Sequence, residues 1–179
     1  MIEKELSFNF NLNIDKIFEL CINENSEMVK RVPEVIEYKQ GDWKENIKKN
    51  VVKIKLTNIP SEIPTKYLNL VLNDDKTVYG KIKINLIERN ENFINLKFTL
   101  KPVSKILSQI NNILKLSRIK ATINIRQCEN IAKIDAKYKI TVINIMDNID
   151  IIEKYIETNL NKLLIQNIIS YLTEIENKS

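Results

Sequence analysis

The fold of this chain is decided by residues 147–179, which read DNIDIIEKYIETNLNKLLIQNIISYLTEIENKS. Apolar residues recur here every three or four positions, the spacing that places side chains on one side of an α-helix. This stripe consists of Ile149, Ile152, Ile156, Leu160, Leu163, Leu164, Ile168, Leu172 and Ile175. An apolar stripe has to be covered by another element, so the segment predicts one long amphipathic helix packed on the rest of the domain.

The element that covers this helix is predicted from the strict alternation of apolar and polar residues upstream. A period of two is typical of strands with one covered and one wet face, which antiparallel sheets commonly have. The alternating segments are residues 2–10, 35–43, 52–56, 82–86, 94–100, 119–125 and 134–142. The predicted fold class is therefore α+β, with a curved antiparallel sheet gripping a long C-terminal helix.

Three helical segments interrupt the strands. Asn13 is expected to cap a short helix, and a second short helix begins after Asn25 or Ser26 and is ended by Pro33. An amphipathic helix is predicted at residues 103–116, between two strands, as an insertion in a single domain of residues 1–179. The apolar residues 67–72 fit either a strand or a helical turn.

Composition indicates one domain that folds without metals or disulfides. The chain has 179 residues and only 2 glycines, so Asn and Asp are expected to take the turn positions with positive φ. Cys21 and Cys128 lie far apart and do not form a disulfide framework. The first residues lack the apolar region of a signal peptide, and no apolar run reaches membrane-spanning length. A cytoplasmic location, with peripheral membrane attachment left open, is the expectation.

The residue types needed for most catalytic sites are missing. The sequence has no histidine, which removes Ser-His-Asp and Cys-His pairs as well as His-ligated zinc. Two glycines cannot supply a phosphate-binding loop. We therefore expect that the protein is not an enzyme and has no catalytic residue, metal site or cofactor. Tyr38, Tyr67 and Tyr138 are candidate acids or hydrogen-bond donors in a pocket, and core packing is the alternative for them.

Two stretches carry a resemblance to a known superfamily. Residues 8–18 (FNFNLNIDKIF) form a strand followed by a capped helix, and residues 140–153 (ITVINIMDNIDIIE) join a last strand to the long helix. Together with the Ile59-Pro60 and Ile63-Pro64 pair, they resemble the START/Bet v 1-like superfamily, also called SRPBCC or helix-grip proteins. The resemblance covers nearly the whole chain and identifies no subfamily.

The resemblance implies a cavity between sheet and helix that binds or transfers a lipid or another apolar small molecule. Alternatives are a protein-interaction or co-chaperone module with a filled core and, third, a cyclase-like enzyme. The expected pocket residues lie on the inward faces of the strands and on the helix. They are Ile54, Leu56, Ile84, Leu86, Leu96, Phe98, Ile123, Ile125, Tyr138, Ile140, Leu160 and Leu164.

Charge and the inserted segment suggest a membrane as a further partner. The net charge is +5, and many lysines alternate with the apolar strand residues, so an anionic membrane surface is one expected partner and a solvated sheet face is the alternative. Nucleic acid is not expected, because exposed aromatic residues are not interleaved with the lysines; the oligomeric state is left open. The predicted membrane or lid residues are Ile106, Leu107, Ile110, Ile113, Leu114, Lys115 and Arg118.

Overall fold

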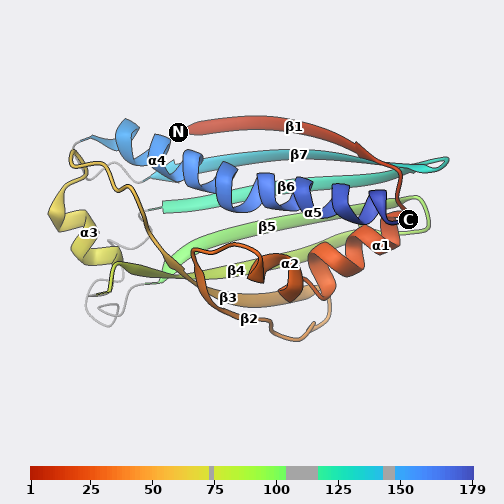
Figure 1. Ribbon diagram of the computed structural model, residues 1–179, viewed down its shortest axis with the longest axis horizontal. Coiled ribbons are helices and arrows are strands. Elements are labelled where there is room, and N and C mark those ends of the chain that lie inside the picture. Colours follow the sequence, from red (N-terminus) through yellow and green to blue (C-terminus); the bar gives the residue numbers. More distant parts are fainter. Residues whose placement is uncertain (73–74, 104–116, 143–147) are drawn as a thin grey trace.

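The computed structural model describes residues 1–72, 75–103, 117–142 and 148–179 (Figure 1). The predicted insertion at residues 103–116 lies outside the described residues except for Val103, which is the last residue of a strand and not part of a helix.

The described residues form seven strands and several helices in the order that the sequence predicts. The strands are β1 (Ile2–Phe10), β2 (Val35–Lys39), β3 (Ile47–Lys55), β4 (Thr77–Arg89), β5 (Phe93–Val103), β6 (Ser117–Cys128) and β7 (Ile131–Val142). The helices are α1 (Ile14–Phe18), α2 (Ser26–Lys30), α3 (Thr65–Val71), α4 (Ile149–Leu160) and α5 (Gln166–Asn177), with π-helical turns η1 (Glu19–Asn23) and η2 (Asn161–Ile165). The predicted fold class is confirmed.

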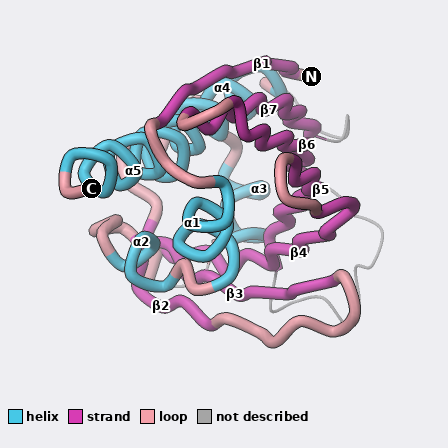
Figure 2. Tube along the Cα trace, turned by 90° about the vertical axis from the view of Figure 1, so that its right-hand side faces the viewer, coloured by secondary structure: helices cyan, strands magenta, loops and turns pink. Residues whose placement is uncertain are grey.

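All seven strands belong to one antiparallel sheet with the order β1-β7-β6-β5-β4-β3-β2. The first strand pairs with the last, from Ile2 opposite Ile140 to Phe10 opposite Ala132. Figure 2 shows that the sheet bends strongly and that α4 and α5 lie across its open side, with α1 and α2 at one end. The bent sheet and the long helix therefore enclose the space between them.

The short helices begin where the sequence predicts, and two local predictions need correction. Asn13 caps α1, since its Oδ1 accepts from the backbone N–H of Asp15 at 2.8 Å. The strand predicted at residues 35–43 ends at Lys39, because Trp43 turns inward and stacks on Phe18. Residues 67–72, left open between strand and helix, belong mainly to α3, which follows Pro64.

Turn residues differ in part from the prediction. Asn58 and Asn148 adopt positive φ as expected, but Glu45, Lys76 and Glu129 do so as well. Of the described residues with positive φ none is an aspartate, and neither glycine has positive φ. Gly41 is needed for another reason, because a Cβ there would collide with the backbone oxygen of Lys49.

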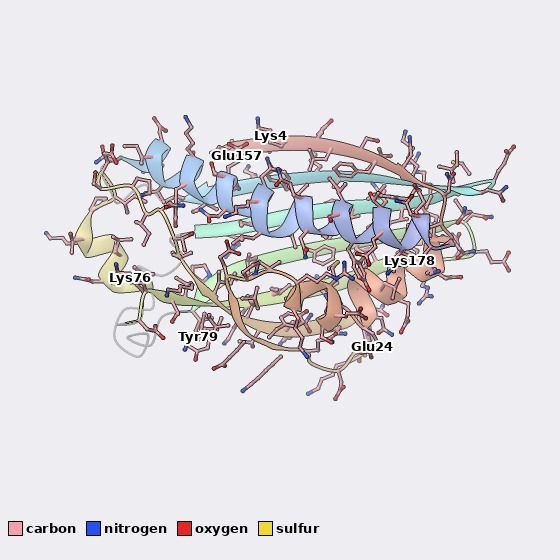
Figure 3. All side chains as sticks on the ribbon, viewed as in Figure 1. Lys4, Glu24, Lys76, Tyr79, Glu157 and Lys178 are labelled. Atoms are coloured by element: carbon pink, nitrogen blue, oxygen red, sulfur yellow. The ribbon has the colours of Figure 1, made fainter. Side chains whose placement is uncertain are left out.

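The C-terminal helix is a continuous run of α4, η2 and α5. An ion pair joins α4 to β1, the edge strand of the sheet. Lys4 lies on the inward side of β1, where the sequence pattern expects an apolar residue. Its Nζ lies 3.5 Å from an Oε1 of Glu157 on α4, and Figure 3 shows the two side chains together beside the helix. This ion pair explains why a lysine interrupts the apolar face at the rim of the sheet.

One end of the molecule has a solid core. There α1, η1 and α5 close against the sheet, and the side chains between them are almost completely buried. This cluster comprises Phe10, Leu12, Ile14, Ile17, Phe18, Ile22, Ile84, Ile94, Leu96, Ile125, Ala132, Ile134 and Leu172. We call it the closed end.

A salt bridge between α2 and α5 predicts a specific acid titration. The hydrogen bond from Arg31, with a second from Lys178, lowers the pKa of Glu174 from 4.5 to about 2. A lowered carboxylate pKa stabilises the folded state above the unfolded pKa, and this stabilisation is lost as the pH falls from about 4.5 towards 2. In an NMR titration of the carboxylates, we expect Arg31→Ala to move the Glu174 midpoint towards 4.5 and Lys178→Ala to move it less. An unchanged midpoint in Arg31→Ala would contradict this assignment.

Candidate functional site

The inward face of the sheet is not buried to the same extent along its length. On β5, Ile94 and Leu96 are fully buried at the closed end, whereas Phe98 and Leu100 on the same face are only half-buried. On β6, Ile125 is buried and the preceding inward residues are not. These half-buried residues of β6 are Ile119, Ala121 and Ile123. Because they face the helix and not the outside, their exposed surface borders a hollow between sheet and helix.

The first hollow has a volume of about 210 Å³ and lies between the middle of the sheet and the C-terminal helix. Almost all of its wall is apolar. The strands contribute Leu6, Phe8, Ile82, Ile84, Phe98, Leu100, Ile119, Ala121, Ile123, Ile125, Ala136 and Tyr138, and the helix contributes Leu160, Leu164, Ile165, Ile168, Ile169 and Leu172.

The second hollow has a volume of about 260 Å³ and extends towards α3. Its wall includes Val52, Ile54, Leu56, Ile63, Leu68, Val78, Ile152, Tyr155, Ile156 and Leu163. Gly80 also lines it. A Cβ at this position would lie 3.1 Å from Leu100 and 3.2 Å from Val52. Glycine therefore avoids crowding these two side chains in the wall.

The two hollows adjoin, because eight of the described side chains border both of them. These shared residues are Met28, Val29, Tyr38, Ile82, Leu100, Ile119, Leu160 and Leu164. We refer to them as the waist. Each hollow alone is smaller than the roughly 300 Å³ at which small-molecule pockets usually begin, but the two together fall within that range. The π-helical turn η2 begins directly after Leu160, at the waist.

Most of the residues predicted to form the pocket border these hollows. Ile84, Phe98, Ile123, Ile125 and Tyr138 line the first hollow. Ile54 and Leu56 line the second, and Leu160 and Leu164 line both. Whether these residues bind a ligand stays a prediction.

Three residues of the predicted set line neither hollow. Leu96 and Ile140 are completely buried, Leu96 in the closed end and Ile140 beside Tyr138 and Leu160. Leu86 packs against the closed end. All three lie on the inward face as predicted, but neighbouring side chains fill the space in front of them.

The predicted membrane or lid residues fall almost entirely outside the described part of the chain. Ile106, Leu107, Ile110, Ile113, Leu114 and Lys115 lie in residues 104–116, which the structure does not describe. Arg118 lies in β6 and borders the second hollow. The lid therefore stays a prediction.

Three polar side chains form a hydrogen-bonded chain in the wall of the first hollow. The Tyr38 hydroxyl donates to Asn25 Oδ1 at 2.6 Å and accepts from Asn50 Nδ2 at 2.8 Å. Only Tyr38 was named from the sequence, and Asn25 and Asn50 were missed. The signal for Asn50 was present, because it has the same parity on β3 as the inward residues Val52 and Ile54.

The polar groups of the wall are not arranged for acid–base chemistry. Burial raises the pKa of Tyr38 to about 12, despite its hydrogen bonds to Asn25 and Asn50, so the phenol stays neutral near pH 7. Burial also raises the pKa of Tyr138 and of Tyr155. Within the described residues, no aspartate, glutamate or histidine lines either hollow.

The described residues contain neither a metal-binding cluster nor a membrane-spanning helix. Nowhere in residues 1–72, 75–103, 117–142 and 148–179 do three or more His, Cys, Asp or Glu side chains gather closely enough to hold a metal ion. Among the helices in these residues, none combines the length and the apolar character that a membrane crossing requires.

The outer face of the sheet carries the expected lysines, but several of them pair with carboxylates. Four salt bridges span 3.0–3.8 Å and join Lys53 to Asp75, Lys133 to Asp135, Lys137 to Glu5 and Lys139 to Glu3. Other lysines of this face, among them Lys55, Lys81, Lys83, Lys97 and Lys120, are exposed. Attachment to an anionic membrane through this face stays a prediction.

Solved structures share this architecture at very low sequence identity. Ara h 8.0201 is 11% identical with a TM-score of 0.59, and the match covers 97% of this chain and 98% of that one. The ZhuI aromatase/cyclase from Streptomyces sp. R1128 is 7% identical with a TM-score of 0.61, over 99% and 94%. A START superfamily protein from Mycobacterium smegmatis is 8% identical with a TM-score of 0.53, over 97% and 98%.

At the level of sequence, no protein-family model and no curated protein matches this chain. The similarity to solved structures therefore concerns the fold. It confirms the START/Bet v 1-like helix-grip fold that the sequence resemblance implied. Proteins with this fold include ones described as aromatase/cyclases, so the fold by itself does not separate binding from catalysis.

Proposed function

We propose that this protein binds a lipid or another apolar small molecule in the two adjoining hollows, without chemical conversion of that ligand. One observation carries the proposal: inward side chains in the middle of the sheet are half-buried because they border unfilled space. For a stable domain, leaving such surface without contacts forfeits dispersion and hydrophobic energy. A ligand that covers about 100 Å² of it would gain on the order of 2.5 kcal/mol.

The chemistry of the wall supports binding over catalysis. The described wall offers neutral side chains such as tyrosine and asparagine, together with Arg118, and no carboxylate or imidazole to move a proton. A co-chaperone with a filled core is supported less well, because two hollows lie between the helix and the sheet. Transfer between membranes and a cytoplasmic location are compatible with the proposal but rest on the sequence alone.

The proposal predicts that filling the first hollow removes binding. Ala121 lies on the inward face of β6, opposite Phe98 and Tyr138 in the neighbouring strands, and borders the first hollow. We expect Ala121→Phe to weaken binding of the neutral fluorophore N-phenyl-1-naphthylamine at least about tenfold, because the ring occupies space that the probe needs. Fluorescence titration measures the affinity, and chemical unfolding should show little loss of stability.

The matched control is Thr122→Phe, which adds the same ring at the next residue, on the outer face of the sheet. It should leave probe binding unchanged. Equal weakening by both substitutions, or no saturable binding by the unmodified protein, would contradict the proposal. Native mass spectrometry of the purified protein then tests for a co-purified apolar molecule and gives its mass.

A further inference from the structure

The hydrogen bonds that link Asn50, Tyr38 and Asn25 have a fixed order of donors and acceptors. At one end, the backbone N–H of Gly41 donates to Asn50 Oδ1 at 3.1 Å. At the other end, Asn25 Nδ2 donates to the backbone oxygen of Cys21 at 3.3 Å. A backbone N–H can only donate and a carbonyl oxygen can only accept. These two backbone groups therefore fix which end of each side-chain amide, in Asn50 and in Asn25, faces Tyr38. The Tyr38 hydroxyl must then donate to Asn25 and accept from Asn50.

Among the described residues, this direction leaves one N–H donor unused on each of the two amides, and Asn50 is the more deeply buried of the two. An amide NH₂ group has two N–H donors, and the Tyr38 oxygen accepts only one of them. The other has no acceptor among the residues that the structure describes, although the Asn50 side chain is only 1% exposed. A buried donor without a partner costs roughly 1–3 kcal/mol, so a bound oxygen atom would relieve this cost.

The position of the chain of hydrogen bonds is as informative as its chemistry. Asn25, Tyr38 and Asn50 all border the first hollow, and Tyr38 also borders the second, so it belongs to the waist. A ligand that fills both hollows therefore has its middle, and not its end, near these three side chains. Within the described residues, the wall of the first hollow is mainly apolar and has no lysine or arginine, so a charged group placed beside Asn50 would be desolvated without a counterion there. Arg118 borders the second hollow.

We infer that the ligand is a neutral, mainly hydrocarbon molecule with a carbonyl or hydroxyl oxygen near its middle, and that this oxygen accepts a hydrogen bond from Asn50 Nδ2. The inference rests on the proposed function and narrows its ligand class. It disfavours fatty acids bound with their charged carboxylate in the first hollow, because the arginine of the described wall, Arg118, borders the second hollow. Asn50 acts here as a specificity residue, and Tyr38 as the residue that orients it.

Benzophenone and diphenylmethane test this inference, because they differ only in a central carbonyl and a central CH₂ group. Displacement of N-phenyl-1-naphthylamine gives the affinity for each. Water solvates the carbonyl, so without a donor in the cavity the hydrocarbon should bind more tightly. We expect the unmodified protein to bind benzophenone at least as tightly as diphenylmethane. Asn50→Leu should weaken benzophenone about tenfold relative to diphenylmethane.

Two controls keep the test independent of folding defects. Tyr138→Phe removes a hydroxyl from the same hollow and should leave the ratio of the two affinities unchanged. In the unmodified protein, the infrared carbonyl stretch of bound benzophenone should lie at the lower frequency of a hydrogen-bonded ketone. A frequency like that in a hydrocarbon solvent, or an unchanged ratio in Asn50→Leu, overturns the inference.

The outcomes also separate this inference from the proposed function. If both compounds bind and Ala121→Phe blocks both, but the carbonyl is free, only the role of Asn50 is wrong. If neither compound displaces the fluorophore and the fluorophore itself does not saturate, the cavity is not a binding site. Tighter binding of biphenyl-4-carbaldehyde, an isomer of benzophenone with a terminal carbonyl, would overturn the central placement of the oxygen.

Discussion

Replacing Leu96 with alanine is expected to lower the free energy of unfolding by about 3–5 kcal/mol. Leu96 is completely buried in the closed end, on the inward face of β5. Its removal leaves a new void surrounded by packed side chains such as Ile84 and Ile94, which cannot collapse into it without strain. Urea unfolding followed by circular dichroism measures the change.

The matched substitution Ile123→Ala should cost much less, about 1–2 kcal/mol. Ile123 pairs directly opposite Leu96 in the sheet, but it is half-buried and borders the first hollow. The substitution enlarges an existing space and opens no new void. Equal losses at Leu96 and Ile123 would mean that the middle of the sheet is packed as tightly as the closed end.

The two cysteines are expected to differ in their reaction with a thiol reagent by about a thousandfold. Burial raises the pKa of Cys21 from 9.0 to about 12, which lowers its thiolate fraction near neutral pH by roughly that factor. Cys128 is exposed at the end of β6. With Ellman's reagent at pH 8, the folded protein should therefore show one fast thiol, and the denatured protein should show two.

The variant Cys128→Ser isolates the slow thiol and serves as the control. Its single cysteine should react only as fast as the protein opens, and urea should accelerate the reaction strongly. Because Cys21 also borders the first hollow, a bound apolar molecule should slow it further. Rapid reaction of Cys21 in this folded variant would show that solvent reaches this part of the wall freely.

Both predictions follow from one asymmetry of the fold. The closed end concentrates completely buried side chains between α1, η1, α5 and the sheet, and it supplies much of the stability. The middle of the sheet does not need to be filled for the chain to fold. A domain with a packed end and an unfilled middle can hold a ligand without depending on it for structure.

The alternation of the strands predicted the inward face well, because side chains on a strand point to opposite faces at every step. It predicted Ile84, Phe98 and Ile123 on the covered side, where the structure has them. The same parity also places Lys48 and Asn50 inward on β3, although both residue types are usually exposed. The sequence prediction followed the polarity of these residues and not their position in the alternation. It therefore missed Asn50 and its hydrogen bond to Tyr38 in the cavity wall.

The alternation does not predict which inward residues border a hollow, as Leu86, Leu96 and Ile140 show. Their position in the alternation is the same as that of Phe98 and Ile123. Leu86 and Leu96 are packed because α1, η1, α5 and neighbouring strands fill the space in front of them. Ile140 is packed because Tyr138 and Leu160 lie against it, whereas Phe98 and Ile123 border the first hollow. Which inward residues border a hollow depends on the distance between helix and sheet, and that distance is not encoded in any one strand.

The apolar stripe of residues 147–179 and the alternation of seven strands determined the fold class by themselves, because both periods follow from backbone geometry. The absence of histidine from the sequence likewise limited the available chemistry. Only the tertiary structure decided that two hollows remain between the long helix and the sheet, and that Asn25, Tyr38 and Asn50 meet in the wall of the first one. Their contacts join α2, β2 and β3 through side chains, and side-chain contacts between separate elements leave no period in a sequence.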